Sequence, residues 1–423
     1  MKKFLALALA AAMSLSLAAC GGGNNNPGSA NTPGSAGNTG SDVSTPVSDN
    51  AGFKVGAIYI TSQNDVAGYT FQHHNGITTA MKDLGMDPAT QLLIVDNVAE
   101  DYDAVGSAID TLANQGADII FGISFGYIDA MADKADEYPD IIFSHGTGYK
   151  SNDTNFNNYF GRIYQARYLA GIAAGMKSLE LGNNSIGYVA AFNTGYAETC
   201  SGINGFALGA QSANPDAVVH VNVINTWGDE VLERQAAQAL VDTYQCGVIS
   251  QHCDSAQPQL VAQENNVFGC GYNSDMTTQA PNAHLAAAIW HWNVYYQTAI
   301  QAAMDCNGDA SQFVNKMGGS AYYAGLKEGF VDVSPLNDAT AAPNTQAVLD
   351  AVRDLIISGE WDVFSGVKLS YNIGADGSVE IVKTDSDLMD NDLNVIVPAG
   401  GPSVDDSVIT GTMDYNVAGV QEG

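Results

Sequence analysis

Aromatic, acidic and small polar side chains recur in this sequence directly after short apolar runs. Asn64, Asp65 and Tyr69 follow the first such run, and Ser124 and Phe125 follow a later one. The same residue types recur in the second half of the chain, at Phe192, Trp227, Asp254, Asn273 and Asp275. Aromatic faces stack on flat rings, and carboxyl, amide and hydroxyl groups pair with polar ring edges. Because few basic side chains accompany them, the pattern indicates a flat, neutral, hydrogen-bonding ligand.

Catalytic chemistry fits the sequence poorly. His252 and Cys253 have the types of a base and a nucleophile, but neighbours in an extended segment point to opposite faces. His73 and His74 would diverge by about 100° around a helix. The sequence has no hydrolase, P-loop or dinucleotide signature and no CxxC pair, and the acidic run 385–392 lacks the central glycine of a calcium loop. We therefore expect a binding protein without catalytic residues, metal or cofactor.

The elements that must position these residues alternate regularly along the chain. Strands rich in Val, Ile and Phe are expected at 53–60, 91–98, 117–124, 141–146, 184–192, 218–227, 246–251, 267–272 and 283–292. Helices are expected at 75–85, 103–116, 127–139, 165–179, 200–213, 232–244, 258–266, 293–305 and 346–359, and a strand pair around a turn at 367–382. This alternation predicts an α/β fold with parallel sheets covered on both faces. Ligands of such sheets lie beyond the carboxyl ends of the strands, where the candidate residues fall.

The N-terminal segment has the three-part pattern of a secretory signal. Two lysines precede an apolar run at 4–17, which is too short for a permanent membrane span. The residues up to Cys20 resemble a bacterial lipoprotein box, in which the cysteine carries lipid; an ordinary signal with an incidental cysteine is the alternative. The Gly-, Asn-, Ser- and Pro-rich stretch that follows predicts a flexible tether. We expect a signal peptide at 1–19, a lipid-anchored tether at 20–52, and a location on the extracytoplasmic face of the cell membrane.

Length and charge limit the class of protein further. The chain has 423 residues, so the part after the tether exceeds what one core usually holds and two lobes are expected. The predicted boundaries are 53–175 plus 283–333 for the first lobe and 176–282 plus 334–423 for the second. The net charge of −31, from 15 basic and 46 acidic residues, argues against a nucleic-acid partner.

Cysteines give little guidance beyond the predicted anchor. Five others stand at Cys200, Cys246, Cys253, Cys270 and Cys306. An exported protein can oxidise pairs of cysteines, but this number is odd and the spacing is irregular. The sequence is compatible with one disulfide at most, or with buried free thiols.

The loop segments taken together resemble a known family. They are SQNDVAGYTFQHHNG, SFGYIDA, NYFGRIYQARYLAGIAAG, IGYVAAF, NTWGD, SQHCDSAQP and GYNSDM, and the likeness covers 54–420. They resemble the basic membrane protein (Bmp) family, the substrate-binding lipoproteins of ABC importers that are similar to purine nucleoside receptors. The resemblance implies the type I periplasmic-binding-protein fold, with two Rossmann-like lobes, parallel sheets and hinge segments around a cleft. It also implies capture of a purine base or nucleoside and its delivery to a permease with its ATPase.

The resemblance also implies roles for individual residues in the first lobe and the facing loop. Tyr69 and Trp227 would stack on the purine from opposite lobes, with Asn64 and Asp65 beside Tyr69. Each of these residues also has a purely structural interpretation. Tyr69 could pack against a helix, Trp227 could close its sheet and Asp65 could cap a helix. Phe125 fits the core as well as it fits a ligand wall.

The second lobe would supply the remaining polar contacts. In nucleoside-binding members an acid bonds the ribose hydroxyls with the help of a lysine, and here Asp275, with Asn273 beside it, matches the acid. Trp290 stands at the apparent position of the lysine, which favours a free base over a nucleoside. By its place at a strand end, Asp254 is expected to accept a hydrogen bond from an exocyclic amine.

Other assignments remain open at this stage. Arg162 and Arg167 flank a tyrosine-bearing helix and are interpreted as structural ion partners. A surface sensor or interaction lipoprotein of the same fold, or a sugar-binding receptor, is the alternative to a purine carrier.

Overall fold

The computed structural model describes residues 50–66 and 68–422 of the chain. The predicted signal peptide, Cys20 and nearly all of the predicted tether lie outside the described residues. A search of the helices in these two stretches finds none with the length and hydropathy of a membrane span.

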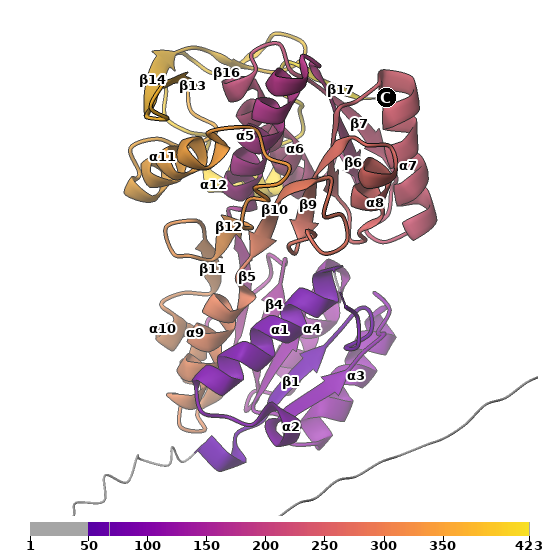
Figure 1. The fold of residues 1–423 in the computed structure, drawn as a ribbon. Helices are drawn as coiled ribbons and strands as arrows, with labels where there is room; N and C mark the ends of the chain where they lie inside the picture. The colour runs from indigo at the N-terminus through magenta and orange to yellow at the C-terminus, as the bar shows by residue number, and fades with distance from the viewer. Residues whose placement is uncertain (1–49, 67, 423) are drawn as a thin grey trace, which may run out of the picture. The chain divides into compact units, whose positions relative to one another are not determined.

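The first lobe is built on six strands among the described residues, all parallel, in the order β11-β5-β4-β3-β1-β2 (Figure 1). The strands are β1 (Val55–Ile58), β2 (Leu92–Val95), β3 (Ile119–Gly122), β4 (Ile142–Gly146), β5 (Phe156–Gly161) and β11 (Ala321–Ala324). The helices are α1 (Gly68–Asp83), α2 (Pro88–Gln91), α3 (Tyr102–Asn114), α4 (Ile128–Glu137), α9 (Trp292–Met304) and α10 (Phe313–Met317), with short 3₁₀ turns at Asn50–Gly52, Phe125–Tyr127 and Ala310–Gln312. The apolar runs of β1 and β3 are fully buried, as central strands covered on both faces require.

Helices cover both faces of this first sheet. On one face α1 and α9 pack together and place Ile77 and Ile300 in the larger core. On the other face α3 and α4 pack together and place Ile109 and Met131 in a separate core. The sheet is therefore sandwiched, and its ligand-binding edge is the row of strand carboxyl ends.

The second lobe repeats the arrangement with seven strands in the described part of the chain, in the order β12-β10-β9-β8-β6-β7-β17. The strands are β6 (Ser185–Ala190), β7 (Val218–Val223), β8 (Val248–His252), β9 (Phe268–Asn273), β10 (His284–Trp290), β12 (Val331–Val333) and β17 (Val420–Glu422). The helices are α5 (Ile163–Leu181), α6 (Ala197–Ala213), α7 (Glu230–Tyr244), α8 (Gln257–Glu264), α11 (Thr345–Ser358) and α12 (Asp406–Gly411). All neighbours are parallel except β12, which runs antiparallel to β10. The predicted α/β class and its parallel sheets are confirmed.

Within the described residues the chain crosses between the two sheets three times, and these crossings differ from the predicted lobe boundaries. The crossings lie at Arg162 between β5 and α5, at His291 between β10 and α9, and at 325–330 between β11 and β12. Strands β10 and β12 thus pair in the second sheet, whereas the sequence placed all of 283–333 in the first lobe. Helix α5 packs on α6 and β10, so it also belongs to the second lobe. Strand and helix alternation does not reveal which sheet a strand joins, because that depends on pairing between distant segments.

Two helices of the second lobe approach each other closely because glycines line their contact. A β-carbon at Gly171 of α5 would lie 2.1 Å from the carbonyl oxygen of Phe206, and one at Gly209 of α6 would lie 2.0 Å from that of Tyr168. No other residue type allows backbones to pack this closely. The rigid α5–α6 pair supports the strands that carry the site described below.

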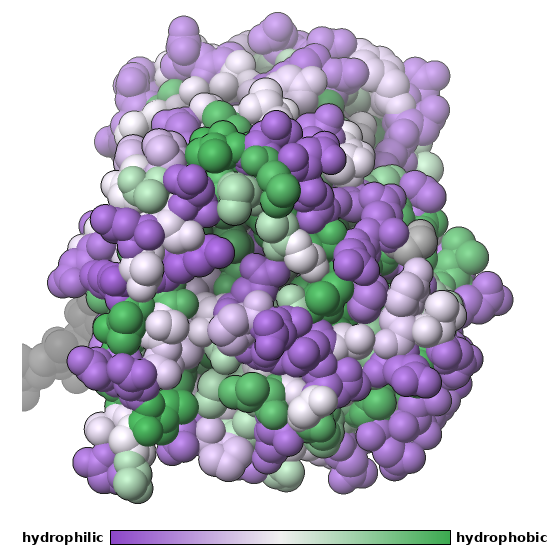
Figure 2. Space-filling view, turned by 90° about the horizontal axis from the view of Figure 1, so that it is seen from above, coloured by the Kyte–Doolittle hydropathy of each residue, from purple (hydrophilic) through white to green (hydrophobic). Residues whose placement is uncertain are grey.

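The C-terminal part adds a hairpin and small pairings to this lobe. The predicted hairpin is present as β13 (Val367–Ile373) and β14 (Val379–Asp385), which pair antiparallel. A second small pair is formed by β15 (Leu388–Met389) and β16 (Val395–Val397). The face shown in Figure 2 is mostly hydrophilic, with apolar side chains in small separate groups. This agrees with the acidic composition of the chain.

The cysteines of the described chain are all reduced and buried. Cys200, Cys246, Cys253, Cys270 and Cys306 are free thiols. Of the two states left open by the sequence, the structure has buried thiols and no disulfide among these five residues.

Candidate functional site

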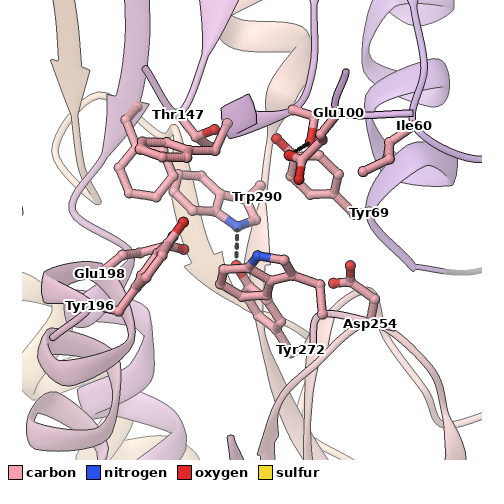
Figure 3. A pocket seen from close by; sticks show the side chains of 13 residues that line it. Ile60, Tyr69, Glu100, Thr147, Tyr196, Glu198, Asp254, Tyr272 and Trp290 are labelled. Atoms are coloured by element: carbon pink, nitrogen blue, oxygen red, sulfur yellow. Dashed lines mark hydrogen bonds between the residues drawn. The ribbon is translucent and has the colours of Figure 1, made fainter. Parts of the chain in front are cut away.

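A cavity lies where the carboxyl ends of the two sheets face each other (Figure 3). Its volume is about 60 Å³, several times the roughly 10–15 Å³ that one water needs. From the first lobe it is lined by Ile60, Tyr69, Glu100, Ser124, Phe125, Thr147 and Phe160. From the second lobe it is lined by Tyr196, Glu198, Trp227, Asp254, Tyr272 and Trp290. Nearly every lining residue sits at the end of a parallel strand or in the loop that follows, where ligands of such sheets bind.

Aromatic rings form much of the cavity wall and brace one another. Trp227 meets Tyr196 edge-on at 5.8 Å between ring centroids and Phe192 at 5.4 Å, and Phe192 stacks on Tyr196 at 5.0 Å. On the hinge side, Trp290 packs against Phe160 at 5.0 Å. Because each ring is fixed by its neighbours, the wall offers preformed flat surfaces for a planar ligand.

Tyr69 projects from the first turn of α1 and lines the cavity from the first lobe. Its ring packs edge-on against His73 and Trp292. Its hydroxyl is buried and has no hydrogen-bond partner among the described residues, and burial raises the pKa of Tyr69 well above its ordinary value. A buried hydroxyl without a partner costs about 1–3 kcal/mol, so this group is available to a ligand.

The residue before Tyr69 sets how closely the lobes approach here. Gly68 has φ +86°, a left-handed conformation that glycine adopts without strain. A β-carbon at Gly68 would lie 2.8 Å from the backbone carbonyl oxygen of Asp254 in the second lobe. The absence of a side chain at Gly68 therefore lets α1 contact the loop after β8.

Asp254 is the lining carboxyl group of that loop. Its backbone N–H donates to the carbonyl of Trp227 at 2.9 Å, and its Oδ1 accepts from Asn273 Nδ2 at 3.0 Å. Burial, and next the negative charge of Glu233, raise the pKa of Asp254 to about 8. A neutral carboxylic acid can donate as well as accept a hydrogen bond.

Glu198 lines the opposite side, at the start of α6. Burial raises the pKa of Glu198 to about 7, and the charge of Arg167 opposes the shift. Its Oε1 lies 3.5 Å from Nε2 of His252, whose pKa burial holds well below its ordinary value. Arg167 itself is buried, lies 3.9 Å from the ring centroid of Tyr272 and donates to the carbonyl of Gln251 at 2.6 Å. This arginine therefore acts behind the wall rather than at the cavity surface.

A third carboxylate, Glu100, completes the acidic lining from the first lobe. Its Oε1 accepts hydrogen bonds from Ser124 Oγ at 2.5 Å and from the backbone N–H of Gly126 at 2.8 Å. The Ser124 carbonyl is 2.7 Å from Nε2 of His145. This network fixes the turn that presents Phe125. The cavity is lined by these three carboxyl groups and by no basic side chain, so it offers no charge partner to an anionic ligand.

Trp290 occupies the end of β10, where the predicted lysine position falls. It is 3 % exposed and stacks on Trp292 at 4.5 Å, and its Nε1 donates to Tyr272 Oη at 3.4 Å. The indole therefore fills space on this side of the cavity. It has no second donor to offer to a ligand hydroxyl.

Some of the predicted site residues are brought together and some are not. Those that line the cavity are Tyr69, Ser124, Phe125, Trp227, Asp254 and Trp290. Phe192 and Asn273 stand behind the wall and hold Trp227 and Asp254 respectively. Asn64 is exposed, and Asp65 accepts from Thr61 Oγ1 at 2.6 Å outside the lining.

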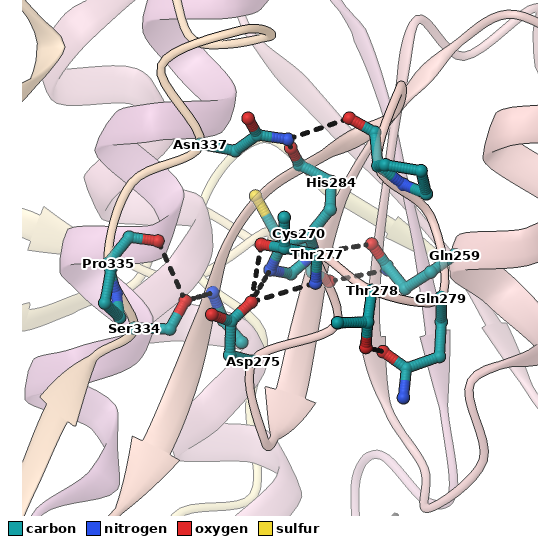
Figure 4. Close-up of polar contacts among 12 residues, drawn as sticks. Gln259, Cys270, Asp275, Thr277, Thr278, Gln279, His284, Ser334, Pro335 and Asn337 are labelled. Atoms are coloured by element: carbon teal, nitrogen blue, oxygen red, sulfur yellow. Dashed lines mark hydrogen bonds and ion pairs between the residues drawn. The ribbon is translucent and has the colours of Figure 1, made fainter. Parts of the chain in front are cut away.

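Asp275 also lies outside the lining, in a different polar cluster (Figure 4). It accepts from the backbone N–H of Thr277 at 2.8 Å and lies 3.7 Å from Nε2 of His284. Its carboxylate therefore caps its own turn, which is the common role of an aspartate after a strand.

The lining includes residues that the sequence reasoning did not single out. They are Ile60, Glu100, Thr147, Phe160, Tyr196, Glu198 and Tyr272. Three of them lie in loops that follow predicted strands, so their position in the sequence could have identified them as candidate site residues: Thr147, Tyr196 and Glu198. Phe160 and Tyr272 lie within strands and gave none.

The cavity opens into a larger cleft on the hinge side. This cleft has a volume of about 890 Å³ and shares Phe125, Thr147, Phe160, Tyr196 and Glu198 with the cavity. It reaches β11 and α12, where Arg162 pairs with Asp406. A ligand in the inner cavity therefore has room for a substituent directed toward this mouth.

Metal and nucleophilic chemistry have no support at this site. Within 50–66 and 68–422 there is no group of three or more His, Cys, Asp or Glu residues placed to hold a metal ion. Cys253 is buried, and its pKa is raised well above its ordinary value, chiefly by burial, so the reactive thiolate is disfavoured. The arrangement is suited to holding a small molecule.

Two α/β lobes joined by crossing segments, with an aromatic and acidic cavity between them, define a solute-binding protein of the periplasmic type. A family model described as ABC transporter substrate-binding protein PnrA-like (Bmp) matches residues 53–363. The chain belongs to this family, so it is the substrate-binding component of an ABC transporter, works on the extracytoplasmic side and delivers small molecules to a permease. It is not an enzyme, as predicted.

Individual relatives agree with this assignment. A purine-binding protein of Brucella abortus is 35% identical over 313 residues, covering 74% of this chain and 83% of the relative. A Haloferax volcanii protein named as a candidate ABC transporter glucose-binding protein is 37% identical over 257 residues, covering 60% of this chain and 61% of that one. Among solved structures, an ABC transporter solute-binding protein of Conexibacter woesei superposes with a TM-score of 0.58 at 19% identity, covering 73% of this chain and 98% of the other.

Proposed function

We propose that this protein captures a purine base or nucleoside in the cavity and delivers it to its permease. The observation that carries the proposal is that Tyr69 and Trp227 line one cavity from opposite lobes. A planar base gains about 1–3 kcal/mol from an aromatic stacking partner. Glu100, Glu198 and Asp254 supply hydrogen-bonding groups for the ring edge, and the purine-binding relative supports this ligand class.

Within this class a free base is the favoured ligand. Trp290 takes up space where a ribose-binding lysine was expected, and the enclosed volume is small. A nucleoside would have to place its sugar in the wider mouth beside Phe160 and Tyr196. We therefore expect bases to bind more tightly than their nucleosides.

Isothermal titration of the purified chain with adenine, guanine, hypoxanthine and their nucleosides tests the proposal. A ligand at 100 times its Kd adds about 2.7 kcal/mol to stability, so a thermal shift gives an independent reading. Binding of any one purine with a matching thermal shift supports the proposal. Absence of both signals for the whole purine panel refutes it.

A sugar is the second candidate ligand, and the name of the Haloferax volcanii relative is what favours it. Aromatic rings stack on sugar faces, and carboxyl groups bond hydroxyls, so the lining residues do not exclude this. Glucose belongs in the same titration. Tighter binding of glucose than of every purine would replace the purine proposal with this one.

We also propose that Cys20 is the site of lipid attachment, which would hold the protein at the membrane. The support is the apolar run ending in Leu-Ala-Ala-Cys and the polar stretch after it. Metabolic labelling of a bacterial host with an alkyne fatty acid should label the wild type and not Cys20→Ser. Equal labelling of both, or of neither, would refute the assignment.

A further inference from the structure

The side chain of Asp254 has an unusual set of neighbours for an aspartate. In the described part of the chain its one hydrogen-bonding side-chain partner is Asn273 Nδ2, which donates to Oδ1 at 3.0 Å. Helix α1 approaches the backbone of this loop at Gly68, and Asp254 is half-buried between the lobes. The other oxygen, Oδ2, has no protein partner there, and the residue lines the cavity.

The charged groups around Asp254 are mostly of its own sign. Glu233 of α7 is fully buried and accepts from the backbone and the hydroxyl of Ser255, the next residue in the chain, at 3.1 and 2.5 Å. Glu198 of α6 faces the same cavity. Arg167 of α5 is the one nearby cation among the described residues; its Nη1 donates to the Gln251 carbonyl, its guanidinium lies over the Tyr272 ring, and it has no hydrogen bond to Asp254.

The other titratable neighbours are weak acids. They are Tyr69 of α1, Tyr272 of β9 and Cys253 of the same loop, and burial raises the pKa of all three. Each is therefore neutral in the folded protein and can offer no positive charge to a carboxylate. Ionised Asp254 would thus have one amide donor, two carboxyl neighbours and no hydrogen bond from a cation, so its charged form is disfavoured.

We propose that Asp254 binds the ligand as a neutral carboxylic acid and donates its proton, from Oδ2, to an unprotonated acceptor atom of the purine ring. The sequence had suggested the opposite polarity, with Asp254 accepting from an exocyclic amine. The inference rests on the proposed purine function. It predicts that Asp254 selects ligands with a hydrogen-bond acceptor, either a ring nitrogen or a carbonyl oxygen, at the ring edge that faces Oδ2.

The proposal makes ligand affinity depend on pH in a defined direction. The pKa of Asp254 is about 8, raised chiefly by burial, so the donor is present below that pH and is lost above it. The ratio of wild-type to Asp254→Asn affinity for adenine, in which the titration of Glu198 cancels, should be constant below about pH 7 and fall about tenfold per pH unit above pH 8. An ionised acceptor would give a ratio that is flat or rises with pH.

Matched variants separate this donor from other titrating groups. Asp254→Asn keeps a neutral donor of the same shape, so it should bind the base at neutral pH and lose the decline above pH 8. Asp254→Ala should bind at least about tenfold more weakly than wild type below pH 8, and the difference should shrink above pH 8 as the wild type loses its donor. Asp216→Asn alters an exposed carboxylate of the same lobe outside the cavity and should keep the wild-type profile.

Analogues locate the acceptor atom. Among the 1-, 3- and 7-deaza forms of adenine, one should lose about tenfold in affinity with the wild type and little with Asp254→Ala. A wild-type profile that is flat or rises with pH, or an Asp254→Asn profile that still declines like the wild type, overturns the donor role. Failure of every purine to bind at any pH would instead refute the proposed function.

Discussion

Replacing Trp227 with alanine is the most direct perturbation of the proposed ligand sandwich. The indole lines the cavity from the second lobe and is held by Tyr196 and Phe192 at 5.8 and 5.4 Å. Its removal deletes one of two stacking surfaces, which is worth about 1–3 kcal/mol of binding. Because 1.4 kcal/mol corresponds to a factor of ten, Kd for the preferred base should rise about 5- to 150-fold.

The same change also costs stability, and the two effects must be separated. Each aromatic pair contributes about 0.5–1.5 kcal/mol, so loss of the contacts of Trp227 should lower stability by about 1–3 kcal/mol. Trp361→Phe is the matched control, because Trp361 is buried in the same lobe against Tyr168 and does not line the cavity. It should lower the melting temperature and leave Kd unchanged.

Isothermal titration and thermal unfolding of the wild type, Trp227→Ala, Trp227→Phe and Trp361→Phe provide the measurement. Trp227→Phe retains a flat ring and should recover most of the affinity. If Trp227→Ala unfolds cooperatively and binds the base within twofold of wild type, stacking from the second lobe is not what holds the ligand. The argument for a two-sided aromatic site then fails.

Three further changes test neighbouring parts of the site. Tyr69→Phe removes a hydroxyl with no hydrogen-bond partner among the described residues. The stability of the unliganded protein should therefore stay the same or rise, while affinity for the base falls about 2- to 10-fold. Unchanged affinity would show that the hydroxyl is not a ligand contact. Gly68→Ala forces a β-carbon toward the Asp254 carbonyl, 2.8 Å away, so affinity should fall and the solution radius of gyration of the liganded protein should increase; a wild-type radius contradicts this. Burial raises the pKa of Asp254 from 3.8 to about 8, so the folded protein holds a proton that the unfolded chain releases, and stability declines from about pH 4 to pH 8. At about 1.36 kcal/mol for each unit of the shift, Asp254→Asn should therefore be more stable than wild type by up to about 5 kcal/mol at pH 8 and equal to it at pH 4. Denaturant unfolding at both pH values that shows no such difference would refute the shift.

Local patterns in the sequence predicted the alternating strands and helices. They did not predict strands that are stabilised by partners distant in the sequence. Strand β5 was not predicted, because Asn157 and Asn158 interrupt its apolar run. Asn157 is nevertheless fully buried, and its Oδ1 accepts from Tyr295 Oη of α9 at 3.1 Å. Polar residues can occupy a central position when a remote side chain satisfies them, and a single sequence does not show that partner.

The residues of the candidate site were likewise predicted in part. Tyr69, Trp227 and Asp254 were recognised because they lie beyond strand ends, where a parallel sheet places its ligand. Asp275 occupies an equivalent position in its own loop, yet its carboxylate turns back onto Thr277. Glu198 lies in the loop after the predicted strand 184–192 but was not singled out, because its position does not show that its side chain faces the cavity. Position along the chain predicts which loops matter, whereas side-chain direction depends on packing that only the folded structure contains.

The contact between Gly68 and the Asp254 loop links the proposed ligand site to the spacing of the two lobes. The residue proposed to bind the base is also one at which the two lobes approach closely. A ligand that fits poorly and displaces this carboxyl group would increase the separation of the two lobes at the same place. A transporter that senses only their spacing would thereby distinguish the correct cargo without ever contacting it.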